Sequence, residues 1–230
     1  MKGKDNQVPS LNPPSNVAKP ATTNDYRTLA SCLAMLRGGL IRPAATTTTM
    51  DSSRQQFLYC SILVPHPPYA SNKTYMDAVA QLDVTAPAQV PVDLLHPNDV
   101  STSLLKGSLN QDVVNTSQIE YFRRVYFSMC FEADDLLGQI IDALDNTGAR
   151  KETFVIMISD HGEDATEHRQ CGKNNMYDSA SRVAMIITGP GITPGQQITS
   201  LASLNDVFPT VLDMAGRKPP LSNRPSAREH

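Results

Sequence analysis

The chain has 230 residues, of which 40% are hydrophobic and 19% are charged. This balance is typical of globular proteins, excludes a wholly disordered chain and predicts one domain or two small ones. The net charge is −3, from 20 basic and 23 acidic side chains, so no basic excess indicates a nucleic-acid partner. The apolar runs are shorter than the roughly 20 residues that a bilayer requires, so no membrane span is expected.

Polar, proline-rich sequence occupies both ends of the chain. We expect residues 1–23 to form a disordered arm and residues 218–230 a disordered tail. The arm lacks the apolar stretch of a signal peptide. Residues 24–217 are expected to form the folded part. Within it, apolar residues recur every three or four positions over 25–37, which predicts an amphipathic helix that ends at Gly38.

Three short apolar runs predict buried strands, at 57–64, 153–158 and 183–187. Between the first two, residues 70–115 have no sustained periodicity over much of their length, which is typical of a long irregular segment. Strands and helices alternate along the chain. This order predicts an α/β fold with a largely parallel sheet that is flanked by helices.

The clearest helix spans about 118–145, where apolar residues recur with a period near 3.6. Ser117 and Glu120 have the spacing of a capping box at its start, and Gly148 supplies a stop after its end. Residues 205–215 predict a last helix. These two helices would cover the predicted sheet.

Four cysteines, Cys32, Cys60, Cys130 and Cys171, are spread along the chain without CxxC spacing. A zinc site is therefore not predicted. We expect buried or free thiols, although spacing leaves a disulfide open.

Polar residues follow two of the predicted strands. His66 follows the first, and Asp160 and His161 follow the second, where ligands of parallel sheets bind. Asp160 and His161 can present a carboxylate and an imidazole to one ion, and Lys173 near a cation requires an anion between them. His66 lies between two prolines, which hold its backbone extended as a mount for a general acid. Taken singly, each of these residues also suits an ordinary surface loop.

Read together, residues 153–191 (TFVIMISDHGEDATEHRQCGKNNMYDSASRVAMIITGPG) resemble the sulfatase family, whose members carry S-D-H/N-G-E, E-H, a lysine and G-P-G in this order. The segments VPHPPY, YFSMCFEADDLLGQIIDAL and SLNDVFPTVLDMAG are also similar to family elements. The resemblance covers about residues 25–216. It implies an alkaline-phosphatase-like α/β fold, as a partial sulfatase domain over 24–217 that is incomplete at its N-terminus.

The resemblance implies hydrolysis of sulfate esters. The substrate would be an aryl sulfate or a sulfated carbohydrate, such as a glycosaminoglycan with a uronic acid 2-sulfate. Asp160 and His161 would bind one calcium ion, and Lys173 would hold the sulfate oxygens. His66 would contact the sulfate and protonate the leaving alcohol. The resemblance also implies that His168, in the E-H element, faces the substrate pocket.

The chain also departs from the family. Sulfatases use a formylglycine made within C-x-P-S-R, and none of the four cysteines has this context, so the nucleophile has no counterpart here. We therefore expect this chain alone to be inactive. Two alternatives remain: a non-catalytic pseudo-sulfatase that binds a sulfated glycan or a protein, and a phosphodiesterase or phosphomutase of the same superfamily. The resemblance implies a lysosomal or secreted location, which the glycosylation sequons at Asn72 and Asn115 fit.

Overall fold

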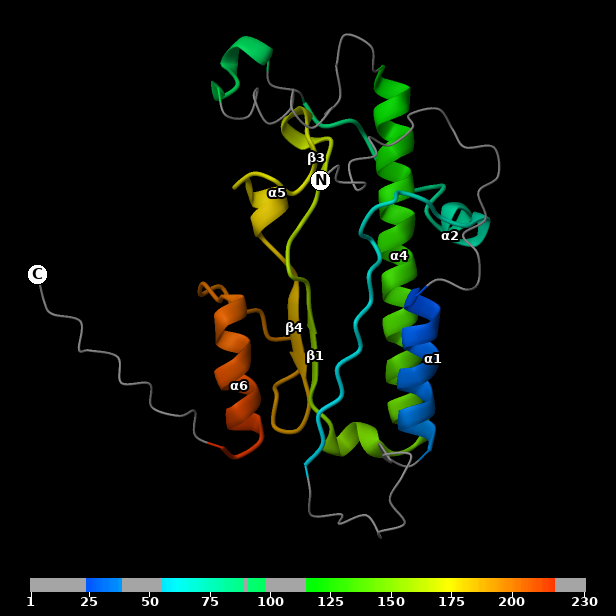
Figure 1. The fold of residues 1–230 in the computed structure, drawn as a ribbon, viewed down its shortest axis with the longest axis vertical. Helices are drawn as coiled ribbons and strands as arrows, with labels where there is room; N and C mark the ends of the chain where they lie inside the picture. Colours follow the sequence, from blue (N-terminus) through cyan, green and yellow to red (C-terminus); the bar gives the residue numbers. More distant parts are fainter. Residues whose placement is uncertain (1–23, 39–54, 89–90, 98–114, 218–230) are drawn as a thin grey trace, which may run out of the picture.

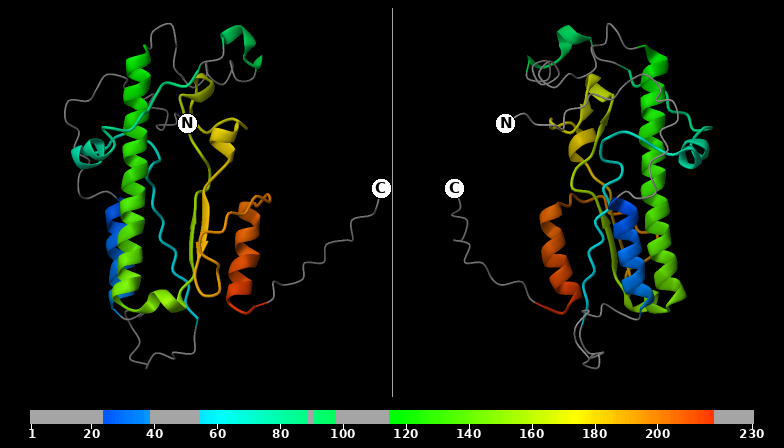
Figure 2. Two further views of the ribbon diagram at one scale, coloured as in Figure 1. Left: turned by 180° about the vertical axis from the view of Figure 1, so that it is seen from behind. Right: turned by 45° about the vertical axis from the view of Figure 1, so that its right-hand side comes forward.

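The structure is a computed structural model, and it describes residues 24–38, 55–88, 91–97 and 115–217. The expected arm, the expected tail and parts of the irregular segment at 70–115 lie outside these residues. Figure 1 shows a long helix, α4, beside the shorter α1, and a narrow two-stranded sheet between this pair and α6. The views in Figure 2 agree, so helices lie on both sides of the sheet.

The long helix α4 (Thr116–Asn146) begins with a capping box. The Asn115 side chain accepts a hydrogen bond from the Gln118 N–H at 2.9 Å, and the Gln118 side chain accepts one from the Asn115 N–H at 3.0 Å. The predicted box of Ser117 and Glu120 is therefore wrong by two residues. Asparagine caps a helix as well as serine does, and glutamine replaces glutamate in the return bond.

One face of α4 forms most of the hydrophobic core. It packs against α1 (Asn24–Arg37) and α2 (Lys73–Ala78), and the predicted stop at Gly148 is confirmed by its left-handed φ of 74°. The buried cluster contains Leu29, Leu33, Val64, Val125, Met129, Leu136 and Ala143. The period of 3.6 in the sequence therefore gave the buried face correctly.

Two strand pairs are present in the described residues, and both are antiparallel. β1 (Val155–Ile158) pairs with β4 (Met185–Thr188), and β2 (Asp164–Ala165) pairs with β3 (Cys171–Gly172). The predicted positions of β1 and β4 are confirmed, but the expected parallel pairing is not what these residues form. A short apolar run predicts burial and leaves the direction of pairing undetermined.

Residues 57–64, expected to be a strand, run extended without a ladder partner among the described residues. Figure 1 shows this segment between the sheet and the pair of α1 and α4. The segment that follows, expected to be irregular, contains α2. The other short elements are η1 (Val92–Leu94), η2 (Ala149–Glu152), η3 (Glu167–Arg169), α5 (Asp178–Ser181), η4 (Leu204–Asp206) and α6 (Val207–Met214).

A disulfide joins Cys32 of α1 to Cys60 of the extended segment, with 6.3 Å between their Cα atoms. The expectation of four free thiols is therefore wrong for this pair, whereas Cys130 and Cys171 are free. Sequence spacing cannot show that α1 packs beside the segment, and only that packing brings the two sulfurs within bonding reach. The bridge fastens the segment that leads to His66 onto a helix.

Asp25 makes a second attachment between α1 and this segment. Its buried carboxylate accepts the Leu63 N–H at 2.5 Å, and the residue is 4% exposed. We expect Asp25→Ala to lower the free energy of unfolding by about 1–3 kcal/mol, because the Leu63 N–H loses its side-chain acceptor. Asp25→Asn keeps an oxygen at this position and should lose less. Urea denaturation of both variants checks this, and equal losses would contradict the assigned bond.

Candidate active site

The loop after β1 turns sharply at Gly162. The Gly162 N–H donates to the Ala180 carbonyl, and the Glu163 N–H donates to the Ser179 carbonyl, each at 2.8 Å. A Cβ atom on Gly162 would lie 2.1 Å from the Ser179 carbonyl oxygen. Glycine is therefore required here by the close approach of α5, and the loop that carries Asp160 is held against that helix.

Asp160 and His161 are neighbours in space as well as in sequence. The Asp160 side chain is 85% exposed, and its Oδ1 lies 3.6 Å from His161 Nε2. His161 Nδ1 lies 2.9 Å from the Gly162 carbonyl oxygen, which can only accept a hydrogen bond. The neutral His161 ring therefore carries its proton on Nδ1 and leaves the Nε2 lone pair available for a cation.

His66 comes to the same place from a distant part of the chain. Its ring centroid lies 6.3 Å from that of His161, and its side chain is exposed. His66 Nδ1 lies 2.7 Å from the Pro67 carbonyl oxygen, so it too donates there and leaves Nε2 free to face solvent. The structure thus brings together three of the five residues singled out in the sequence.

Lys173 reaches this group through Glu163. The Glu163 carboxylate accepts hydrogen bonds from the Tyr69 hydroxyl and the Gly172 N–H, and the positive charge of Lys173 attracts it. Burial raises the pKa of Glu163, while these three partners act to lower it. Lys173 is therefore adjacent to the loop after β1, and a carboxylate absent from our sequence prediction connects the two.

His168 lies apart from the other candidates in its described contacts. Its ring stacks on Tyr177, with 3.6 Å between centroids and 8° between planes. Its φ is 50°, and Thr166 and Arg169 also have positive φ values, of 82° and 59°. Three non-glycine residues in the left-handed region make an unusual turn, and such turns gather at functional sites.

A buried polar network supports this turn. Asp164 accepts hydrogen bonds from the Ser179 hydroxyl and from Asn175, which also donates to Gln170 at 2.9 Å. Burial raises the pKa of Asp164, and the Ser179 and Asn175 bonds oppose that rise. The network shows why α5 and the turn between β2 and β3 keep their relative positions.

Arg123 connects the same turn to α4. Its guanidinium donates to the Ala165 carbonyl at 2.6 Å and pairs with Glu167 at 2.5 Å. We did not identify Arg123, Tyr69 or Glu163 from the sequence. The available signal for Arg123 was a charged residue between buried Phe122 and Val125 of α4.

Asp160 and His161 do not by themselves fit a calcium ion. They offer one carboxylate and one imidazole, whereas calcium takes 6–8 oxygen ligands. Across the described ranges, no group of three or more His, Cys, Asp or Glu side chains could hold a metal ion. We therefore derive no step through calcium. Any calcium site would need oxygen ligands beyond this pair.

The two free thiols are poorly suited to act as nucleophiles. Burial, together with the nearby carboxylates of Glu163 and Asp164, raises the pKa of Cys171 to about 12. Burial also raises the pKa of Cys130. Both thiols are therefore protonated at neutral pH, where the thiolate would be the reactive form.

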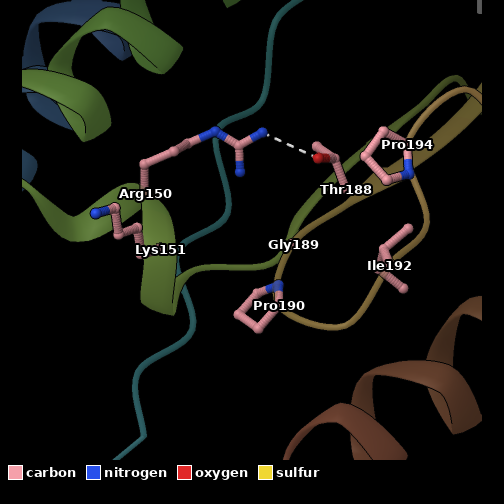
Figure 3. Close-up of a pocket in the computed structure, with 7 residues that line it drawn as sticks. All are labelled: Arg150, Lys151, Thr188, Gly189, Pro190, Ile192 and Pro194. Atoms are coloured by element: carbon pink, nitrogen blue, oxygen red, sulfur yellow. Dashed lines mark hydrogen bonds between the residues drawn. The ribbon is translucent and has the colours of Figure 1, made fainter.

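A pocket lies at the opposite end of the β1 and β4 pair. Figure 3 shows Arg150 of η2 donating to the Thr188 hydroxyl, at 2.9 Å, beside the G-P-G turn. Its lining consists of Arg150, Lys151, Thr188, Gly189, Pro190, Ile192 and Pro194. None of the predicted site residues lines it, so it is separate from the candidate site.

Solved structures share this fold. The phosphonate monoester hydrolase SpPMH of Silicibacter pomeroyi matches with a TM-score of 0.64 at 23% identity, over 86% of this chain and 39% of that one. The phosphonate monoester hydrolase of Agrobacterium radiobacter matches with a TM-score of 0.62 at 25% identity, over 85% of this chain and 39% of that one. The sulfatase family profile matches residues 17–217. The chain belongs to the sulfatase family, and the expected alkaline-phosphatase-like α/β class is confirmed.

Within the family, the chain is similar to curated arylsulfatase K proteins. It is 38% identical to that of Xenopus laevis over 179 residues, which cover 72% of this chain and 33% of the relative. It is 33% identical to that of Homo sapiens over 172 residues, which cover 69% of this chain and 32% of the relative. The chain therefore spans about a third of the length of the curated relatives it matches. Among the described helices, none is long and apolar enough to cross a membrane.

Proposed function

We propose that the protein hydrolyses sulfate esters and that this chain contributes its sulfate-binding residues. The observation that carries the proposal is the approach of the His66 and His161 rings, to 6.3 Å, from segments far apart in the sequence. Lys173 adjoins the same loop through the shared carboxylate Glu163. A cationic side chain and two imidazoles at one surface suit a tetrahedral anion.

Each residue has a proposed role. Lys173 neutralises charge on the equatorial sulfate oxygens, which favours transfer of the sulfuryl group. In its doubly protonated form, His66 donates the Nε2 proton to the leaving oxygen, while its Nδ1–H stays bound to the Pro67 carbonyl. Asp160 and His161 are proposed as two ligands of a larger calcium shell, which would supply positive charge beside the sulfate when the ion is bound. His168 is proposed as a substrate contact. We assign no nucleophile to this chain.

The substrate class and location are also proposals. Relatives named arylsulfatase K support an aryl sulfate or a sulfated carbohydrate, with a glycosaminoglycan uronic acid 2-sulfate as the specific candidate. A lysosomal or secreted location is supported by the Cys32–Cys60 disulfide, because such bonds persist in oxidising compartments. The sequon residues Asn72 and Asn115 are both helix N-caps that accept through their side-chain oxygens, which leaves their amide nitrogens for a glycan.

Two other functions can be distinguished from this one. A pseudo-sulfatase would bind a sulfated glycan without turnover. A phosphodiesterase, phosphomutase or other phosphate-ester or phosphonate-ester enzyme of the same superfamily is the second alternative, and the 25% identical phosphonate monoester hydrolase of Agrobacterium radiobacter supports it. Sulfate and phosphate carry different charges at neutral pH, so binding of the two inorganic ions separates the phosphate-ester alternative from the main proposal. A pseudo-sulfatase would bind sulfate too and differs only in the absence of turnover by the whole protein.

We expect Lys173→Ala to weaken binding of inorganic sulfate about tenfold or more, because one charged contact is lost. Titration calorimetry of this chain measures it. Lys151→Ala, at the opposite end of the sheet, is the matched control and should bind as the unchanged chain does. Equal affinities of the two variants would overturn the assignment.

Enzyme assays complete this test. The chain alone should not turn over an aryl sulfate, since it lacks the formylglycine sequence. Turnover that disappears in Lys173→Ala would contradict that expectation. Tighter binding of phosphate than of sulfate would favour the phosphate-ester or phosphonate-ester reading.

A further inference from the structure

Glu163 lies where three separate segments of the candidate site meet. Its backbone continues directly from the loop of Asp160 and His161. Its carboxylate accepts a hydrogen bond from the hydroxyl of Tyr69, three residues after His66. It also accepts the N–H of Gly172, the residue before Lys173. One side chain thus contacts each segment that carries a residue of the proposed sulfate site, apart from the turn that carries His168.

The Tyr69 side of this junction is firmly held. The Tyr69 ring packs edge-on against Phe122 of α4, with 4.7 Å between centroids and 76° between planes. The hydroxyl therefore has a fixed position from which to reach Glu163. This matters for His66, whose exposed side chain makes its one described hydrogen bond within its own turn. The bond from Tyr69 to Glu163 is the direct polar link between the His66 segment and the loop after β1 that the structure describes.

The Lys173 side depends on charge as well as on a hydrogen bond. The Gly172 N–H fixes the backbone before Lys173, and the carboxylate attracts the ammonium group of Lys173 itself. The Glu163 N–H in turn donates to Ser179, so the position of the carboxylate is set by the loop against α5. A neutral residue at 163 could keep a hydrogen bond but could not attract Lys173.

We infer that Glu163 is a positioning residue, which aligns His66 and Lys173 with the loop of Asp160 and His161 through its bonds to Tyr69 and Gly172. This inference rests on the proposed function, because the alignment serves sulfate binding only if that function is correct. The alignment itself is a property of the chain and can be tested without any substrate. Glu163 is not proposed to touch the sulfate.

Hydrogen exchange of the full chain, read by mass spectrometry, tests the alignment. Tyr69→Phe should reduce protection about tenfold in the peptide that spans 63–72, because the hydroxyl bond is lost while the ring still packs. Glu163→Ala should reduce protection in 63–72 and also in 170–175. Glu163→Gln retains an oxygen that can accept a hydrogen bond from Tyr69. It should therefore keep the protection of peptide 63–72 and lose that of 170–175.

A double substitution and a matched control make the test sharper. Adding Tyr69→Phe to Glu163→Ala should not reduce the protection of peptide 63–72 any further, because both substitutions remove the same bond. Tyr75→Phe removes another tyrosine-to-carboxylate bond, to Asp135 at 2.8 Å, away from the site. It should lower overall stability without altering 170–175 or the NMR signals of the His66 and His161 rings.

Three results would overturn the inference. The first is a Tyr69→Phe chain in which 63–72 and the ring signals are unchanged. The second is a Glu163→Gln chain that behaves as Glu163→Ala does in 63–72. The third is additive loss in the double variant. Failure of the unchanged chain to bind inorganic sulfate is a different result, because it would count against the proposed function and leave the exchange pattern to decide the role of Glu163.

Discussion

Gly162→Ala is expected to destabilise the chain by about 3 kcal/mol, the upper end of what overpacking usually costs. The added methyl group would lie 2.1 Å from the Ser179 carbonyl oxygen, which belongs to the backbone and cannot rotate away. Relief requires the loop and α5 to separate. That movement would break the bonds from Gly162 to Ala180 and from Glu163 to Ser179. Urea denaturation, followed by circular dichroism, measures the loss.

Gly138→Ala is the matched control for this substitution. Gly138 is an exposed residue in the interior of α4, and a Cβ atom there would meet nothing within 4 Å. Alanine should therefore stabilise the chain by about 1 kcal/mol through helix propensity alone. The two alanine substitutions are thus expected to change the stability of the chain in opposite directions. A Gly162→Ala chain as stable as the unchanged one would show that the loop does not approach α5 as described.

Removal of the disulfide is expected to have an effect of similar size. Cys32 and Cys60 are 28 positions apart, and a closed loop of this length stabilises a fold by about 3–4 kcal/mol in the chain-entropy account. For a chain of this size, that loss corresponds to a decrease in Tm of about 10 °C. The double substitution Cys32→Ala/Cys60→Ala, compared with the unchanged chain under oxidising conditions, gives the value by thermal denaturation.

Reduction by dithiothreitol should lower the Tm of the unchanged chain to that of the double variant. Cys130→Ala is the control, since this thiol is free and its loss leaves the bridge intact. It should respond to the reductant as the unchanged chain does. If reduction leaves the Tm unchanged, the bridge is absent or contributes nothing to stability.

The sequence predicted the helical part of the fold well. The apolar period over 118–145 is long and regular, so α4 and its buried face follow from it. The strand positions β1 and β4 were also predicted, whereas their antiparallel direction was not. Direction depends on how the chain returns through the turn between β2 and β3. That turn is held by side-chain contacts, such as Arg123 to Glu167, that no local pattern reveals.

The candidate site residues come from sequence motifs, whereas the contacts that connect them come from the structure. His66 and His161 were chosen from motifs, and their approach is a tertiary result. Glu163 and Tyr69 lie within the same motifs, yet we did not single them out, because neither has chemistry that marks it alone. Sequence spacing likewise leaves the Cys32–Cys60 pairing open. Contacts between distant segments require the packing of α1 and α4 to be known first.

The extended segment after residue 55 has a consequence for the behaviour of the protein in solution. Phe57, Tyr59 and Leu63 lie along it and are 69%, 74% and 54% exposed. Ser61 is exposed as well, while Leu58, Cys60 and Ile62 are half-buried. Such an arrangement is an apolar extended segment without a ladder partner among the described residues, and an edge of this kind can pair with another strand. We expect this stretch to promote self-association of the isolated chain. Any added strand, from whatever polypeptide, would find there both hydrogen-bonding groups and apolar area.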